Sequence, residues 1–113
     1  MKLIKPNVHA VLDYAVVAVL LASPSLFPFT SPIAIFTYVL GAVHLTLTVA
    51  TDFPGGLLKI IPLKVHGIIE LIVSILLFVS IWIFPGISGF DRNYYLAFSF
   101  AVFLTWLLSD YES

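Results

Sequence analysis

The chain has 113 residues, of which 61% are hydrophobic and only 10% are charged, and its formal net charge is −1. An ordinary soluble domain carries about 25% charged residues, so this composition excludes that class, and it offers no basic surface for a nucleic-acid partner. The chain has no cysteine, which excludes disulfides, thiolate nucleophiles, iron–sulfur clusters and c-type haem attachment.

Four long apolar stretches predict four membrane-spanning helices. Apolar runs of about 20 residues are long enough to cross a bilayer, and a helix satisfies its own backbone polar groups in lipid. Prolines and small polar residues delimit the runs. The expected helices cover about residues 8–22, 32–51, 63–84 and 93–109. Short loops make them antiparallel neighbours, so we expect an all-α, integral membrane four-helix bundle that forms one transmembrane domain, 1–113.

The first expected helix also resembles a signal peptide, because Lys2 and Lys5 precede an apolar core. Asp13 in the middle of that core argues against cleavage, so we expect a retained helix. It should end at Ser23–Pro24, because proline removes a backbone donor and disfavours helix in the preceding residue. By the same reasoning the segment from Pro85 to Asp91 is expected to be a loop before the fourth helix.

The sequence contains an internal repeat, of about residues 8–53 and 65–111. His9 and Asp13 in the first copy correspond to His66 and Glu70 in the second, and both offsets are 57 residues. Each copy contains two expected helices, so we predict two tandem two-helix repeats related by an axis along the membrane normal.

Positive charge is unevenly distributed between the expected loops. Lys2, Lys5, Lys59 and Lys64 lie on one side of the bundle and only Arg92 on the other. Cytoplasmic loops carry the excess of lysine and arginine. We therefore expect a multi-pass protein of the cell (inner) membrane with both termini in the cytoplasm.

The first copy of the repeat ends Ser23-Pro24-Ser25, and the corresponding part of the second copy reads Ser80-Ile81-Trp82. Each contains two letters of the Ser-Pro-Trp motif, so the chain resembles the SPW-repeat type of small bacterial membrane protein. The resemblance covers the first and third helices and the duplication. It implies a duplicated helical membrane protein and assigns no chemistry to any residue.

Three histidines and two carboxylates are expected to converge in the cytoplasmic half of the bundle. His9 and Asp13, like His66 and Glu70, are four residues apart, which puts each pair on one helix face about 6 Å apart along the axis. His44 in the second helix reaches the depth of the two carboxylates. It belongs to a stripe of small and hydroxylated residues, typical of a packed membrane-helix face: Thr37, Gly41, His44, Thr48 and Thr51.

This group has several possible roles. Imidazole and carboxylate ligands suit zinc, iron, manganese or copper, so His9, Asp13, His66 and Glu70, with His44 as a fifth member, could hold a transition-metal ion. The carboxylates could instead orient the histidines, or the group could relay protons. A b-type haem is disfavoured, since only one histidine pair could form at one depth and the carboxylates are poor neighbours for it. The pairs could also serve helix packing alone.

We therefore expect a small membrane protein that binds or passes a transition-metal ion or protons. The alternative is a non-catalytic scaffold or partner-binding subunit whose pairs stabilise helix packing. No nucleophile or cofactor motif appears, so the sequence favours neither an enzyme nor a specific substrate. The lipid bilayer is the expected partner, and a bundle this small would need a homodimer or larger assembly to form a pore.

Overall fold

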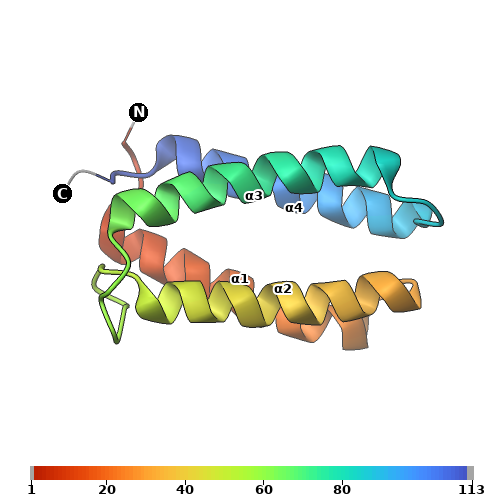
Figure 1. Cartoon of the computed structure of the whole chain (residues 1–113), viewed down its shortest axis with the longest axis horizontal. Helices are drawn as coiled ribbons and strands as arrows, with labels where there is room; N and C mark the ends of the chain where they lie inside the picture. The colour runs from red at the N-terminus through yellow and green to blue at the C-terminus, as the bar shows by residue number, and fades with distance from the viewer. Residues whose placement is uncertain (1, 112–113) are drawn as a thin grey trace.

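The computed structural model of this chain describes residues 2–111, and within that range it contains four α-helices and no β-strand. They are α1 (Pro6–Leu26), α2 (Ser31–Ala50), α3 (Leu63–Ile83) and α4 (Gly89–Leu108). The helices pair closely as two antiparallel hairpins, α1 with α2 and α3 with α4 (Figure 1). Each hairpin is one copy of the repeat, so the duplicated four-helix bundle expected from the sequence is confirmed.

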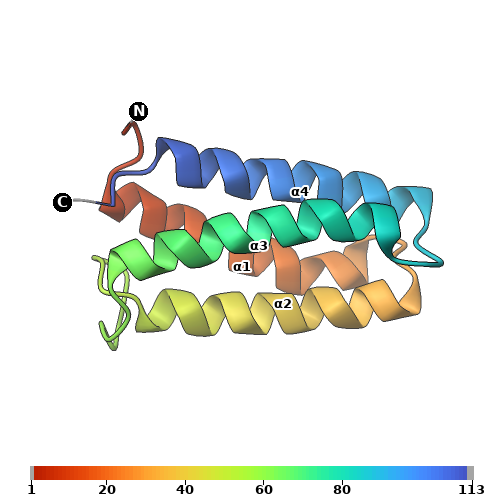
Figure 2. The same ribbon diagram turned by 45° about the horizontal axis from the view of Figure 1, so that its top comes forward.

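The two ends of the bundle differ in their connections. Both ends of the chain and the α2–α3 linker lie at one end, and the other two loops lie at the opposite end (Figures 1 and 2). The backbone measures 42 × 26 × 19 Å overall. A helix of 20 residues is about 30 Å long, which matches the hydrocarbon thickness of a bilayer.

The outer surface is that of a membrane protein. Among the described residues, α1, α2 and α3 are long and apolar enough to cross a membrane. The fourth helix has 20 residues, as α2 has, but it contains Asp91 and Arg92 near its start and is not among the three. Large apolar side chains point outward along the helices, and Ile35, Val39 and Val43 on α2 are 65%, 55% and 60% exposed.

Two helix boundaries differ from the sequence expectation. The first helix does not end at Ser23–Pro24 but continues through Pro24 to Leu26. Pro24 costs one backbone hydrogen bond near the helix end, where the Phe27 N–H still donates to the Ser23 carbonyl at 2.9 Å. The fourth helix begins at Gly89 rather than near residue 93, because Ser88 and Asp91 form a reciprocal capping box.

Asp91 also joins the two hairpins at the loop end of the bundle. This carboxylate is fully buried. It accepts hydrogen bonds from the Thr30 hydroxyl at 2.7 Å, from the Thr30 N–H at 3.3 Å and from the Ser88 N–H at 3.1 Å. Thr30 is the N-cap residue of α2, so one side chain on α4 connects both hairpins.

Two tyrosines add to this connection. The Tyr94 hydroxyl donates to Ser23 Oγ at 2.9 Å, and the Tyr95 hydroxyl lies 2.5 Å from Thr37 Oγ1. Tyr95 is 2% exposed, so its ring lies in the interior of the bundle. Its hydroxyl finds a partner on the stripe of hydroxylated residues of α2, which does face inward.

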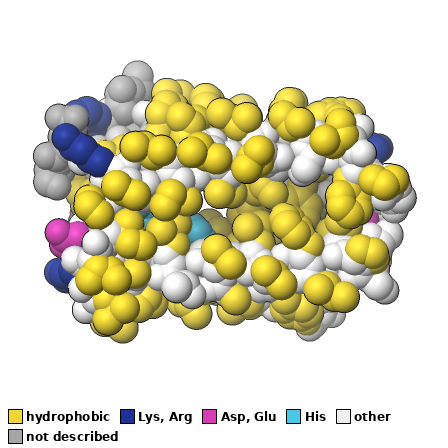
Figure 3. Space-filling model, viewed as in Figure 1, with side chains coloured by type: hydrophobic (Ala, Val, Ile, Leu, Met, Phe, Trp, Pro, Cys, Tyr) yellow, Lys and Arg dark blue, Asp and Glu magenta, His cyan; other side chains and the backbone are white. Residues whose placement is uncertain are grey.

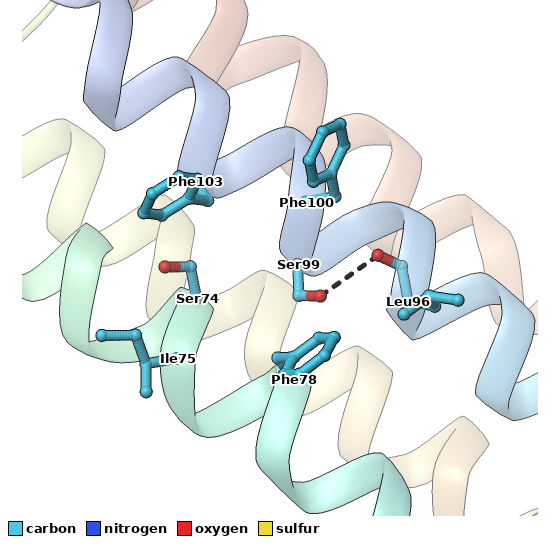
Figure 4. Close-up of a pocket in the computed structure, with 7 residues that line it drawn as sticks. All are labelled: Ser74, Ile75, Phe78, Leu96, Ser99, Phe100 and Phe103. Atoms are coloured by element: carbon cyan, nitrogen blue, oxygen red, sulfur yellow. Dashed lines mark hydrogen bonds between the residues drawn. The ribbon is translucent and has the colours of Figure 1, made fainter.

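A recess of about 390 Å³ lies between α3 and α4 (Figure 4). Three phenylalanines line it, and Ser74 and Ser99 allow the two helices to approach there. Both hydroxyls donate to carbonyls of their own helices, Ser74 to Leu71 at 2.8 Å and Ser99 to Leu96 at 3.1 Å. The recess is therefore an apolar surface feature and takes no part in the polar interior.

We expect Asp91→Asn to lower the free energy of unfolding by about 1.5–3 kcal/mol, because hydrogen bonds to a buried charged acceptor contribute that much. Denaturant titration of the detergent-solubilised protein measures the change. Asp52→Asn, at an exposed position, is the matched control and should stay within about 0.5 kcal/mol of the parent. Equal effects of both substitutions would contradict the connecting role of Asp91.

Candidate metal centre

Four side chains from α1 and α3 meet near the end of the bundle that holds the chain termini. His66 Nε2 lies 2.6 Å from Glu70 Oε1 on its own helix and 3.0 Å from Asp13 Oδ2 on α1. His9 Nε2 lies 2.6 Å from Glu70 Oε1 on α3 and 3.4 Å from Asp13 Oδ2 on its own helix. Each histidine therefore contacts both carboxylates, and the two pairs predicted from the repeat face each other.

The cluster is sealed from solvent. His9, Asp13, His66 and Glu70 are 1%, 3%, 0% and 4% exposed. One ligand atom from each lies within 4.8 Å of the other three, so this buried group could hold a metal ion.

Thr51, the C-cap residue of α2, determines which nitrogen of His66 faces the cluster. The Thr51 hydroxyl donates to the Leu47 carbonyl at 2.6 Å and lies 2.7 Å from His66 Nδ1. A hydroxyl has a single proton, so Thr51 Oγ1 accepts from His66 Nδ1–H. His66 Nε2 is then the nitrogen available to a metal, and a hydrogen bond to the other ring nitrogen is what orients histidine ligands in metal sites.

The charges of the cluster require a cation. With both imidazoles neutral, Asp13 and Glu70 would leave two negative charges in an apolar interior, and burying unpaired charge is costly. The lone pair of His66 Nε2 would also face two carboxylate oxygens at 2.6 and 3.0 Å. Either protons on the imidazoles or a metal ion between the four side chains offsets this charge.

The spacing fits a metal ion after a small expansion. In a tetrahedral zinc site with ligands at about 2.0–2.1 Å, neighbouring ligand atoms are about 3.3 Å apart. The His66–Asp13 and His9–Asp13 distances, 3.0 and 3.4 Å, are close to that value, whereas each histidine lies 2.6 Å from Glu70 Oε1. An ion would therefore have to move the Glu70 carboxylate by several tenths of an ångström.

His44 lies beside this group without joining it. Its Nε2 is 3.7 Å from Asp13 Oδ1, the oxygen that faces away from the other two histidines. That distance is too long for a hydrogen bond, and His44 Nε2 is buried with no hydrogen-bond partner among residues 2–111. The sequence predicted that His44 lies at the depth of the carboxylates, and it does lie beside Asp13. In the structure, however, it is not one of the four residues whose ligand atoms converge.

Two aromatic side chains that the sequence analysis did not assign to the site cover the histidines. The Phe53 ring lies 6.1 Å from the His9 ring and 5.6 Å from the His66 ring, and the Tyr111 ring lies 5.5 Å from that of His9. They are 58 residues apart, one more than the offset between the histidines, so they occupy nearly corresponding places at the ends of the two repeats. That correspondence is the signal that could have identified them.

Tyr111 is held over the cluster by close packing. A side chain at Gly67, next to His66, would meet the Tyr111 ring at 2.9 Å. Burial and then the charge of Glu70 raise the pKa of the Tyr111 phenol, so it stays protonated. Ile4 pairs with this segment, because its N–H donates to Leu108 and its carbonyl accepts from Asp110.

No family model matches this chain. No curated protein and no solved structure matches it either. The site must therefore be interpreted from its own geometry.

We expect the His66 Nδ1 proton to exchange slowly with water in ¹⁵N-histidine NMR spectra, because it is buried and donated to Thr51. Thr51→Val keeps the shape but removes the acceptor, so this proton should become exchange-broadened or move to Nε2. Thr48→Val is the matched control, since the Thr48 hydroxyl donates to the His44 carbonyl and touches no ring nitrogen. An unchanged spectrum in Thr51→Val would contradict the assigned tautomer.

Proposed function

We propose that this chain is an integral membrane protein that binds one divalent transition-metal ion through His9, Asp13, His66 and Glu70. The observation that carries the proposal is the convergence of four buried ligand atoms within 4.8 Å, in a group whose two carboxylates need positive charge beside them. The crosswise contacts between the repeats support it, because they put donors from both hairpins around a single point.

The donor set favours some ions over others. Two imidazole nitrogens and two carboxylate oxygens suit zinc, iron, manganese or copper better than magnesium or calcium, which prefer oxygen ligands alone. A haem group fits poorly, because the His9 and His66 rings are in edge contact with centroids 5.2 Å apart. That separation leaves no room for a porphyrin between them.

Holding an ion fits the interior better than passing one across the bilayer. Beyond the cluster, large apolar side chains are buried in the bundle, including Leu20, Leu77 and Ile81 at 0%, 5% and 2% exposed. Transport would therefore need a homodimer or larger assembly, and the protein is proposed as a metal-binding membrane protein rather than an enzyme.

One observation favours a second candidate. The two contacts of 2.6 Å to Glu70 are slightly shorter than charge-assisted hydrogen bonds between imidazolium and carboxylate, about 2.7–2.9 Å, and much shorter than ligand spacings around a metal. The cluster could thus carry protons, either as a relay or as a hydrogen-bonded core of a membrane scaffold. Metal content distinguishes these possibilities.

We further propose a location in the cell (inner) membrane, with α4 as the fourth span and the lysine-bearing end in the cytoplasm. The positive-inside rule supports this orientation, since both chain ends and the α2–α3 linker lie together (Figure 2). In Figure 3 most of the visible lysine and arginine side chains lie at that end. Membership of the SPW-repeat type is also a proposal, and it rests on the two partial Ser-Pro-Trp motifs and the duplication.

Elemental analysis of the detergent-purified protein, loaded with zinc or iron and desalted, should find about one ion per chain. The double variant His9→Ala/His66→Ala should lose it, because half of the ligands are gone. A second comparison uses two substitutions of aspartate by asparagine, which keep the shape of the side chain. Asp13→Asn should lose most of the metal, and Asp91→Asn should keep it, although both remove a buried carboxylate charge.

Circular dichroism confirms which variants are folded before metal is measured. Metal retained by folded Asp13→Asn and by the double variant would overturn the proposed ligands. The absence of each offered ion from the folded parent protein would overturn metal binding and leave the proton and packing candidates.

Cysteine labelling tests the orientation, and the chain has no native cysteine to interfere. Leu57→Cys lies in the α2–α3 linker, where Leu57 is 78% exposed, and Pro85→Cys lies in the loop at the opposite end. A membrane-impermeant maleimide on intact cells should label Pro85→Cys at once and Leu57→Cys only after lysis. The reverse pattern would contradict the cytoplasmic placement of the termini.

A further inference from the structure

Two small cavities lie beside the cluster, in the gaps between the helices. Each has a volume of about 60 Å³, and both are lined by His44, Glu70, Phe98 and Val102. One reaches the gap between α2 and α3 beside Val43 and the other the gap between α1 and α4, where Asp13 joins the lining. In Figure 3 histidine side chains are visible in the hollow between the hairpins.

The cavities exist because the hairpins are joined mainly at their ends. The cluster connects them at one end and Asp91 at the other, whereas close helix pairing occurs within each hairpin. Apart from His44 and the two carboxylates, the lining is almost entirely apolar. A route of this kind admits small lipid-soluble molecules and disfavours ions.

His44 is the one histidine that lines both cavities, and its Nε2 lacks a hydrogen-bond partner among the described residues. A buried polar atom of this kind normally finds a partner in water or a ligand. It stands next to Asp13, on the side of the cluster that the other histidines do not occupy. An iron ion held by four protein atoms has coordination positions left for an external ligand.

We propose that the cavity beside His44 is a binding site for a neutral diatomic molecule, such as nitric oxide or dioxygen, that enters from the bilayer and coordinates the metal. This inference rests on the proposed metal site. The size of the cavities supports it, since drug-sized ligands need pockets of about 300–1,000 Å³. His44 Nε2–H donates a hydrogen bond to the bound ligand, and such donors beside an open metal position determine how firmly diatomic ligands are held.

Nitric oxide binding to the anaerobic, iron(II)-loaded protein in lipid nanodiscs tests the inference, with iron content measured first in each variant. Electron paramagnetic resonance should detect an iron–nitrosyl signal in the parent protein. His44→Leu should retain iron and release nitric oxide about 3- to 10-fold faster, the effect of one lost hydrogen bond. Val102→Phe should slow association, because the added ring fills both cavities.

Val79→Phe is the matched control for the route. Val79 is 46% exposed on α3 and lines neither cavity, so this variant should bind nitric oxide as the parent does. Equal association rates in Val102→Phe and Val79→Phe would overturn the lipid route, and unchanged release from His44→Leu would overturn the role of His44. Loss of iron from His44→Leu would make His44 a metal ligand instead.

The experiments distinguish the diatomic-ligand site from the metal site on which it depends. An iron-loaded protein that forms no nitrosyl complex overturns the diatomic site and leaves the metal site intact. A folded protein that takes up no iron or other ion overturns the metal site, and the diatomic site with it.

Discussion

The charge of two buried carboxylates is the constraint on which the rest of the site depends. Asp13 and Glu70 lie in an apolar bundle, 3% and 4% exposed, where unpaired charge is expensive. Membrane segments contain ionisable residues rarely and usually for function. The four-residue spacing within each helix and the crosswise contacts between helices both bring imidazole nitrogens to these oxygens. The proposed metal ion between them would complete the charge balance.

The duplication explains how a short chain surrounds a single point with donors. Each repeat supplies a histidine and a carboxylate from its first helix, and an aromatic cover, Phe53 or Tyr111, from the segment after its second. The symmetry is imperfect in one respect. Thr51 orients His66, whereas His9 Nδ1 has no hydrogen-bond partner among the described residues. The ring orientation of His66, with Nε2 toward the cluster, is therefore fixed by a hydrogen bond to Thr51. In the part of the chain that the structure describes, no such hydrogen bond fixes the ring of His9.

The sequence predicted the helices, the repeat and the pairing of His9 with Asp13 and of His66 with Glu70 on one helix face, because apolar run length and one-turn spacing are local properties. It left open whether the two pairs face each other, because that depends on how α1 and α3 are rotated in the bundle. It could not predict which nitrogen of His66 faces inward or that His44 stands apart, since both depend on how α2 is rotated against its neighbours. The fold of the α2–α3 linker over the site was also missed, because backbone hydrogen bonds from residues 57–61 to the last carbonyls of α2 determine it. The predicted start of α4 was several residues too late, because the residues around the capping box of Ser88 and Asp91 resemble a polar loop in the sequence.

X-ray absorption spectroscopy of the zinc-loaded protein tests the central claim most directly, because it reports the ligands of the bound ion. We predict two imidazole nitrogens and two carboxylate oxygens at about 2.0–2.2 Å, with the imidazole contribution lost from the His9→Ala/His66→Ala variant. A spectrum with oxygen ligands alone, or one that the double variant leaves unchanged, would contradict a metal centre built from the two repeats.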